Sequence, residues 1–215
     1  MLNIYKYHNE PETLIGNSQS IDFEYFFYKK PDAKRIRGGV KNINELAKNP
    51  QLSYLYARYI GKRFPLGEPS ILTSSRYAEQ YAQHVIYDRW EEAEPIIATN
   101  AIDSVNYAQF TLEARFPEGE AVIAKSPLRS YHYANSDFLD RFPEGEDAIA
   151  TSAEYSYYYA KEVLGDEFPE GEDAIAKDGK YSYWYALYVI NGRFEKGEDV
   201  INKSHYRNLY EKDFL

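Results

Sequence analysis

The sequence has no cysteine and only one methionine among its 215 residues. Without cysteine, disulfide bonds and thiolate chemistry are excluded, and the absence fits a reducing compartment. No stretch approaches the roughly 20 consecutive apolar residues of a membrane-spanning helix. Residues 1–20 also lack the apolar run of a signal peptide. We therefore expect a cytosolic protein, located in the cytoplasm and without a membrane span.

Recognisable catalytic motifs are also absent. The sequence contains no H-E-x-x-H, P-loop, G-x-S-x-G or G-x-G-x-x-G pattern. We therefore expect no enzymatic activity and no cofactor.

The formal net charge of −9 is unevenly distributed. Residues 1–62 hold ten Lys and Arg against six Asp and Glu, which gives +4, whereas residues 63–215 hold fifteen against twenty-eight, which gives −13. An acidic body of this size repels phosphate backbones at long range, which argues against general nucleic-acid binding. The basic cluster around Lys29, Lys30 and Arg35 could still contact an anionic partner.

Tyrosine is the most unusual component, with 23 copies, whereas the apolar fraction of 44% is ordinary for a folded domain. Aromatic rings with a polar tip must therefore do much of the packing. The tyrosines belong to an internal repeat. Related hexapeptides begin every 26 residues, namely RFPLGE at 63, RWEEAE at 89, RFPEGE at 115 and 141, EFPEGE at 167 and RFEKGE at 193.

The repeat defines the domain organisation. We number its positions from the first residue of each hexapeptide. Another copy without the FPEGE segment occupies residues 38–62, and a degraded copy begins at Thr13. The predicted parts are an N-terminal cap at 1–37 and tandem repeats over 38–215, divided as 38–62, 63–88, 89–114, 115–140, 141–166, 167–192 and a C-terminal cap at 193–215.

Two adjacent positions hardly vary between the copies, as expected for a repeated packing constraint. Position 19 is tyrosine, and the degraded copy has Tyr25 there. Position 20 is alanine. The members are Tyr56, Tyr81, Tyr107, Tyr133, Tyr159 and Tyr185, followed in each case by Ala57, Ala82, Ala108, Ala134, Ala160 and Ala186.

The second half of each repeat is predicted to be a long helix. Its Ala-x-x-Val-Leu spacing places positions 16, 20, 23 and 24 on one helical face, with position 19 flanking this stripe and position 18 pointing away. The FPEGE segment introduces a shorter helix, because Pro and Gly favour a turn and acidic residues favour a helix N-terminus. Neither helix buries its apolar face alone, so we expect an all-α fold, a right-handed solenoid of about seven stacked two-helix repeats.

These residues also carry a resemblance. The run RFPEGEDAIA joined to YSYYYAKEVL resembles the tandem repeats in uncharacterised proteins of large tailed bacteriophages, and the two-helix architecture is similar to leucine-rich-repeat-variant and other α-solenoids. The resemblance covers residues 38–215. It implies expression in a host bacterial cytoplasm and a role in the virus–host contest or in assembly, without an assigned chemistry.

The four histidines do not indicate a metal site. They fall at different repeat positions, so repeat symmetry does not bring them together. They are His8, His84, His132 and His205.

Acidic residues recur at the start of the short helix. Because the copies share them, they are interpreted first as helix N-terminal and turn residues. Stacked in a ladder, they could alternatively mimic the charge of DNA, although neighbouring Arg and Lys side chains reduce this effect. The ladder consists of Glu118, Glu120, Glu144, Glu146, Asp147, Glu170, Glu172 and Asp173.

The aromatic residues divide by position. Tyrosines at positions 15 and 19 are expected beside the core, with hydroxyl groups reaching turn groups or water. Positions 18 and 22 face solvent on a regular helix, and an exposed aromatic track over consecutive repeats is typical of a partner-binding face. Gap filling between helices, or a dimer contact, is the alternative. The candidate binding residues are Phe110, His132, Tyr158, Trp184 and Tyr188.

The sequence therefore predicts a non-enzymatic binding protein, monomeric or homodimeric, without metal. Its expected partner is a host protein with a basic and apolar patch, such as a nucleic-acid-handling or defence enzyme, which it would sequester or inhibit. Three alternatives stay open: a DNA mimic, a nucleic-acid-binding repeat protein whose tyrosines stack on bases, and a structural or assembly protein of a phage.

Overall fold

The computed structural model describes residues 26, 29, 40, 42–138 and 141–215. Tyr25, the degraded copy from Thr13 and nearly all of the predicted cap at 1–37 lie outside these residues. The described residues form helices joined by turns, and no strand occurs among them. An all-α fold is thus confirmed for the described part of the chain.

The chain divides into two compact units, residues 1–73 and 74–215. The division falls inside the repeat 63–88, between its short and its long helix. In the first unit, Asn49 caps the long helix by accepting a hydrogen bond from the backbone N–H of Leu52. The helices described in this unit are α3 (Ile43–Leu46), α4 (Pro50–Ile60) and α5 (Glu68–Ile71).

The second unit alternates short and long helices. Three of the short ones are preceded by a 3₁₀ turn, namely η4 (Glu91–Ala93), η7 (Pro169–Gly171) and η9 (Glu195–Gly197). The short helices are α7 (Glu94–Ile97), α9 (Pro117–Ile123), α11 (Pro143–Ile149), α13 (Glu172–Ile175) and α15 (Glu198–Asn202). The long ones, four of which continue directly into a π-helix, begin with α6 (Ser75–Tyr81), α8 (Ala101–Tyr107), α10 (Pro127–Ala134), α12 (Ala153–Tyr158), α14 (Gly179–Tyr185) and α16 (Arg207–Phe214).

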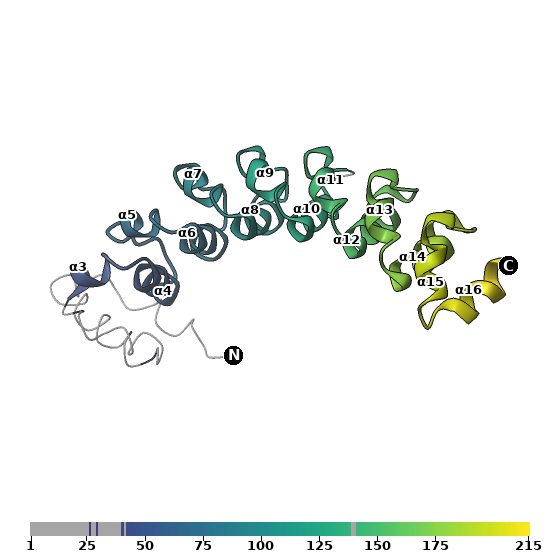
Figure 1. The fold of residues 1–215 in the computed structure, drawn as a ribbon. Coiled ribbons are helices and arrows are strands. Elements are labelled where there is room, and N and C mark those ends of the chain that lie inside the picture. The colour runs from purple at the N-terminus through teal and green to yellow at the C-terminus, as the bar shows by residue number, and fades with distance from the viewer. Residues whose placement is uncertain (1–25, 27–28, 30–39, 41, 139–140) are drawn as a thin grey trace. The chain divides into compact units, whose positions relative to one another are not determined.

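Helices of one kind contact each other across consecutive repeats. The pairs α6 and α8, α8 and α10, α10 and α12, and α12 and α14 are in contact, as are α7 and α9, and α9 and α11. Figure 1 shows the short helices α7, α9 and α11 along one edge of this unit and the long helices along the other. Each repeat therefore buries its apolar face against the next repeat.

Local sequence explains where the long helices begin. Position 12 holds a side chain that accepts hydrogen bonds from the first turn of α4, α8, α10, α12 and α14, but not of α6. Ser152 accepts from the N–H of Tyr155, and Asp178 accepts from the N–H groups of Lys180 and Tyr181. Such a residue satisfies amide groups that have no partner within the helix.

The end of most long helices departs from the regular wheel. Positions 20–24 form a π-helix, whose i→i−5 hydrogen bonds widen the turn. In the repeat 141–166, Val163 and Leu164 at positions 23 and 24 are only half-buried, whereas Tyr159 at position 19 is fully buried. The predicted stripe is right at positions 16 and 20 but wrong here at 23 and 24. The π-helices are η3 (Ala82–Ile86), η5 (Ala108–Leu112), η6 (Tyr159–Leu164) and η8 (Ala186–Ile190).

The position-19 tyrosine occupies the centre of the core and not its flank. Its ring packs edge-on against the aromatic residue at position 2 of the next repeat, as Tyr133 does against Phe142 with centroids 5.0 Å apart. Both rings are fully buried. Burying each such side chain contributes roughly 1.5 to 3 kcal/mol. The same edge-on contact joins Tyr107 to Phe116, Tyr159 to Phe168 and Tyr185 to Phe194, and Tyr81 meets Trp90 in a tilted arrangement.

Its hydroxyl group explains why position 19 is tyrosine and not phenylalanine. The Tyr133 hydroxyl accepts a hydrogen bond from the backbone N–H of Phe116 at 2.8 Å and donates to Glu120 Oε1 at 2.9 Å. Arg115 completes the group with two bonds of 2.8 Å to the same carboxylate. Each such network ties the long helix to the turn that precedes the short helix of its own repeat.

Glycine at position 5 permits a close approach between consecutive repeats. A Cβ atom on Gly171 would lie 2.5 Å from Ser156 Oγ and 2.5 Å from Phe168 Cδ1. Where position 5 is alanine, at Ala93, position 16 of the preceding repeat is alanine as well, at Ala78, and both are fully buried. At this contact the methyl group of alanine at position 5 is thus accompanied by the loss of the serine hydroxyl at position 16.

Candidate functional site

Aromatic rings run without interruption across three consecutive long helices, α10, α12 and α14. The ring centroids of Tyr131 and Tyr158 are 6.0 Å apart, those of Tyr158 and Tyr181 are 6.4 Å apart, and those of Tyr181 and Trp184 are 5.8 Å apart. Tyr157 also contacts Trp184, at 5.7 Å. We call these five residues, together with Phe110, His132 and Tyr188, the aromatic face.

Exposure divides the predicted binding residues into two groups. Phe110 is 59% exposed and Tyr188 is 56% exposed, and His132 is exposed as well. Tyr158 and Trp184 are half-buried among their neighbours. Solvent therefore reaches all five residues to different extents.

Tyrosines at positions 15 and 17 fill gaps between adjacent long helices. Tyr131, Tyr157, Tyr181 and Tyr183 are buried between adjacent long helices. Tyr158 and Trp184 at position 18 also pack against neighbouring rings, so gap filling applies to them as well. Rings at 15 and 17 form a packed base, and rings at 18 and 22 are presented above it.

Two lysines lie over rings of the aromatic face. Lys180 Nζ is 4.5 Å from the ring centroid of Tyr181 and 4.4 Å from that of Trp184. Lys161 Nζ is 5.8 Å from the Tyr157 centroid and 5.3 Å from the Tyr188 centroid. Because the face of an aromatic ring is electronegative, it attracts ammonium and guanidinium groups.

Carboxylates border the aromatic face and accept from its hydroxyl groups. Within the face, Tyr131 donates to Glu162 Oε2 at 2.5 Å. Beside the face, Tyr183 on α14 donates to Asp213 Oδ2 at 2.8 Å. Burial, followed by the nearby carboxylate, raises the pKa of Tyr131 well above its usual value. Burial likewise raises the pKa of Tyr157 to about 12. These tyrosines are therefore neutral hydrogen-bond donors at physiological pH.

His132 is the one titratable group among the five predicted binding residues that ionises near neutral pH. Burial lowers its pKa, and the charge of Arg129 lowers it further. The imidazole is therefore mainly neutral at pH 7. It adds an uncharged ring to the aromatic face.

The acidic ladder separates into two sets. The position-6 members are engaged inside the fold: Glu120 with Arg115 and Tyr133, Glu146 with Arg141 and Tyr159, and Glu172 with Lys196. The hydrogen bond from Arg141 lowers the pKa of Glu146, although burial opposes this effect. The exposed members are Glu118, Glu144, Asp147, Glu170 and Asp173.

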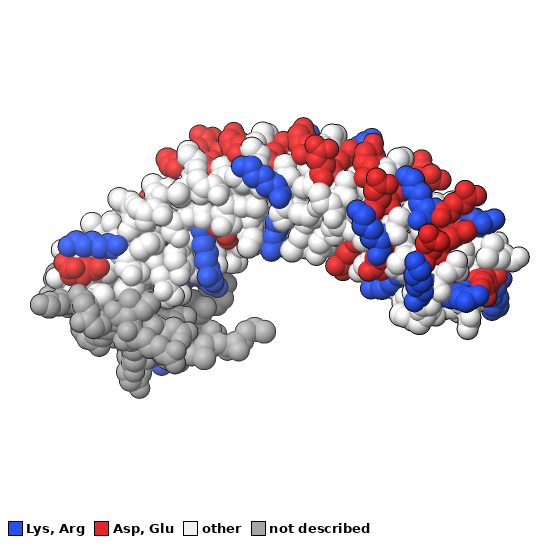
Figure 2. Space-filling view, viewed as in Figure 1, with Lys and Arg blue, Asp and Glu red and all other residues white. Residues whose placement is uncertain are grey.

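The exposed acids lie away from the aromatic face. They belong to the short-helix segments, and Figure 2 shows acidic side chains gathered along the edge where Figure 1 places α7, α9, α11 and α13. The internal use of position 6 reduces the charge available for DNA mimicry. It supports the interpretation of these acids as residues that hold the turn together.

Sequence reasoning missed several residues at the aromatic face. Lys161, Glu162 and Lys180 vary from copy to copy and had no repeat signal to single them out. Asp213 lies in the divergent last repeat, 30 residues from its partner Tyr183. Only the packing of successive long helices shows that these side chains meet the aromatic rings.

Within the described part of the chain, no group of three or more His, Asp or Glu side chains could hold a metal ion. No helix there has both the length and the apolar character that crossing a membrane requires. Comparison with protein-family models, with curated proteins and with solved structures finds no match to this chain.

Proposed function

We propose that the chain is a right-handed α-solenoid of about seven two-helix repeats and acts as a non-enzymatic protein-binding module. Helices of one kind contact each other from repeat to repeat in the second unit. The same tyrosine, alanine and isoleucine positions are buried each time. A stack of this kind presents an extended surface on which a partner contacts several repeats at once.

The aromatic face is the observation that carries this proposal. It combines exposed rings, such as Phe110 and Tyr188, with buried tyrosines of the long helices. Rigid aromatic anchors with polar tips are the residues that most often dominate binding energy at protein interfaces. Half-buried Trp184 is the expected hot spot because its ring contacts both Tyr157 and Tyr181.

The partner is expected to carry a basic and apolar patch. Lys161 and Lys180 already show that these rings accept cationic groups. Glu162 and Asp213 add negative charge beside them, and the chain as a whole has a net charge of −9. The phage resemblance would make this partner a host protein, which the module sequesters in the host cytoplasm.

The test is affinity capture from bacterial lysate with the tagged protein, before and after nuclease treatment. Trp184→Ala should weaken binding of the captured protein by about 2 kcal/mol or more while leaving the fold intact. Ile102→Ala is the matched control, because Ile102 is 46% exposed on α8 and is not part of the aromatic face. Equal affinity of Trp184→Ala and the unmodified protein would remove this site.

Nucleic-acid binding is the second candidate, favoured by exposed rings and two lysines on consecutive helices. Stacking on bases would use the same aromatic face. In this case the captured material would be nucleic acid, and nuclease or moderate salt would remove it. The acidic edge in Figure 2 argues against this candidate through long-range repulsion.

A further inference from the structure

The repeat 115–140 ends differently from the four repeats whose long helices continue into a π-helix. In the repeat 115–140, α10 stops at Ala134, and Asn135 has φ −83° and ψ 30° instead of continuing into a π-helix. At position 23, where other copies have Val85, Val163 and Val189, this repeat has Asp137. A charged residue thus replaces an apolar one where the helix end opens.

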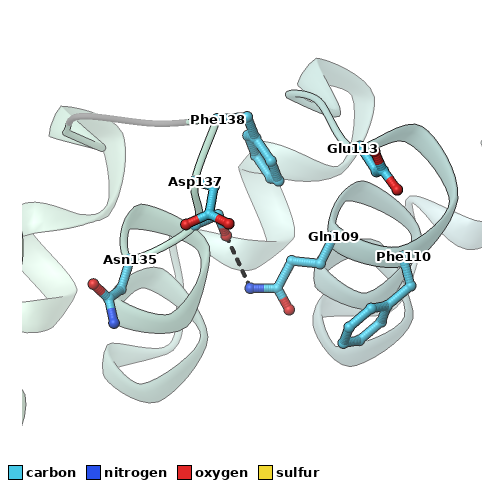
Figure 3. Close-up of a pocket in the computed structure, with 7 residues that line it drawn as sticks. Gln109, Phe110, Glu113, Asn135, Asp137 and Phe138 are labelled. Carbon is cyan, nitrogen blue, oxygen red and sulfur yellow. Dashed lines mark hydrogen bonds between the residues drawn. The ribbon is translucent and has the colours of Figure 1, made fainter.

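A hollow of about 660 Å³ lies at this place, between η5 and the segment that follows α10. Its lining side chains come from both segments, and Gln109 reaches from one to the other, as Figure 3 shows. The hollow is lined by Gln109, Phe110, Glu113, Asn135, Ser136, Asp137 and Phe138.

Gln109 fixes the two walls relative to each other. Its side-chain Nε2 donates to the carbonyl oxygen of His132 at 2.9 Å and to Ser136 Oγ at 2.8 Å. Phe138 is held from behind by Tyr133, with ring centroids 6.0 Å apart. These hydrogen bonds and the ring contact fix the two segments that line the hollow.

The lining has a definite chemistry. Glu113 and Asp137 contribute two exposed carboxylates, while Phe110 and Phe138 contribute aromatic rings. Asn135 adds an amide oxygen that accepts hydrogen bonds. Carboxylates attract a cationic head group, and the rings contact both the cation and an apolar stem. This combination fits an organic cation with a hydrocarbon chain better than it fits a metal ion, which takes oxygen ligands on several sides.

We propose that this hollow binds a basic side chain, lysine or arginine, of the protein partner. The inference rests on the proposed function, because Phe110 belongs both to the hollow and to the aromatic face. The hollow supplies a charged anchor at one end of that face, and the rings of α10, α12 and α14 supply the apolar contacts. The partner's basic and apolar patch would thus be read by two adjoining parts of one surface.

A titration of the full chain with short blocked peptides tests the hollow without the natural partner. Acetyl-Gly-Arg-Gly-amide is added to ¹⁵N-labelled protein, and the side-chain amide signals of Gln109 and Asn135 are followed by NMR. We expect saturable shifts at these signals, with a dissociation constant on the order of 1 mM. Acetyl-Gly-Glu-Gly-amide should produce no such shifts.

Variants decide whether the hollow is responsible. Glu113→Gln combined with Asp137→Asn should weaken binding of the arginine peptide about tenfold, because both charges are removed. Phe110→Ala should also weaken it, which provides a second test if the double variant does not fold. Glu144→Gln, an exposed acid of the short-helix edge, is the matched control and should change nothing.

Two results would overturn the proposal: no shift at Gln109 and Asn135, or shifts that persist in both the double variant and Phe110→Ala. The outcome is separate from that of the proposed function. If the peptide binds but Trp184→Ala has no effect on partner capture, the hollow stands and the aromatic face fails. If capture depends on Trp184 but the peptide does not bind, the aromatic face stands and the hollow fails.

Discussion

Lys196 Nζ lies 2.9 Å from Glu172 Oε2, although the two residues belong to different repeats. Four other repeats of the second unit have arginine at position 1, and that arginine pairs with the position-6 glutamate of the same repeat. The repeat 167–192 has Glu167 at position 1, and the lysine at position 4 of the following repeat takes over the pairing. The fold thus retains a cation beside the half-buried carboxylate by a different route.

This substitution of one cation for another predicts a rescue experiment. Lys196→Met should lower the urea midpoint of unfolding slightly, because Glu172 is only 14% exposed and loses its partner. Adding Glu167→Arg should restore the midpoint by recreating the pair found in the other repeats. If Glu167→Arg raises stability equally with and without Lys196, the two side chains do not serve the same carboxylate.

The hydroxyl group of Tyr133 is predicted to be worth more than an exposed ion pair. Tyr133→Phe removes the bonds to the Phe116 N–H and to Glu120, so a buried amide loses its acceptor. The expected loss is about 1 to 3 kcal/mol of unfolding free energy, measured by urea denaturation. Tyr158→Phe is the matched control in the neighbouring repeat and should cost much less, because its half-buried ring is not part of such a network.

The contact between positions 5 and 16 predicts non-additive substitutions. Gly171→Ala places a methyl group against Ser156 and Phe168 and should destabilise the protein by about 1 to 3 kcal/mol. In a Ser156→Ala background the cost of Gly171→Ala should be smaller, as the natural pair of Ala78 and Ala93 indicates. A double-mutant cycle by chemical denaturation measures this difference. Strict additivity would show that the serine hydroxyl does not limit the approach.

Glu79 predicts a dependence of stability on pH. It is 3% exposed, its Oε1 has no hydrogen-bond partner within the described residues, and burial together with the charge of Asp103 raises its pKa to about 7. At a pH between the ordinary pKa of 4.5 and about 7, Glu79 is therefore protonated in the folded state and ionised in the unfolded chain. Its contribution is fully present below the ordinary pKa of a glutamate and is lost as the pH rises through 7.

The raised pKa of Glu79 sets the size of this pH dependence. Between about pH 5 and pH 8, ionisation of Glu79 should cost at most about 3 kcal/mol of unfolding free energy. Glu79→Gln stays neutral, so its urea midpoint should fall less over this range than that of the unmodified protein. If the two proteins show the same pH dependence, a group other than Glu79 is responsible for it.

The repeat alone determined much of the architecture. A 26-residue period with tyrosine and alanine at positions 19 and 20 indicates a unit that buries the same surface each time, and the described residues are helical as expected. The turn residues and acids of RFPEGE indicated the short helix, because their effects are local. These features depend on backbone geometry and on side chains only a few residues apart.

Tertiary structure decided what side chains do across larger separations. The π-turns moved Val163 and Leu164 out of the predicted stripe. Short ion pairs with Arg115, Arg141 and Lys196 engage three of the eight residues of the apparent acidic ladder. The sequence predicted Phe110, Trp184 and Tyr188 as an exposed track, but only the packing between successive helices shows which aromatic rings are exposed and which are buried. Only the opened end of α10 revealed the hollow beside Phe110. The reason is physical: exposure and pairing depend on which helices lie next to each other, which the repeat pattern by itself does not specify.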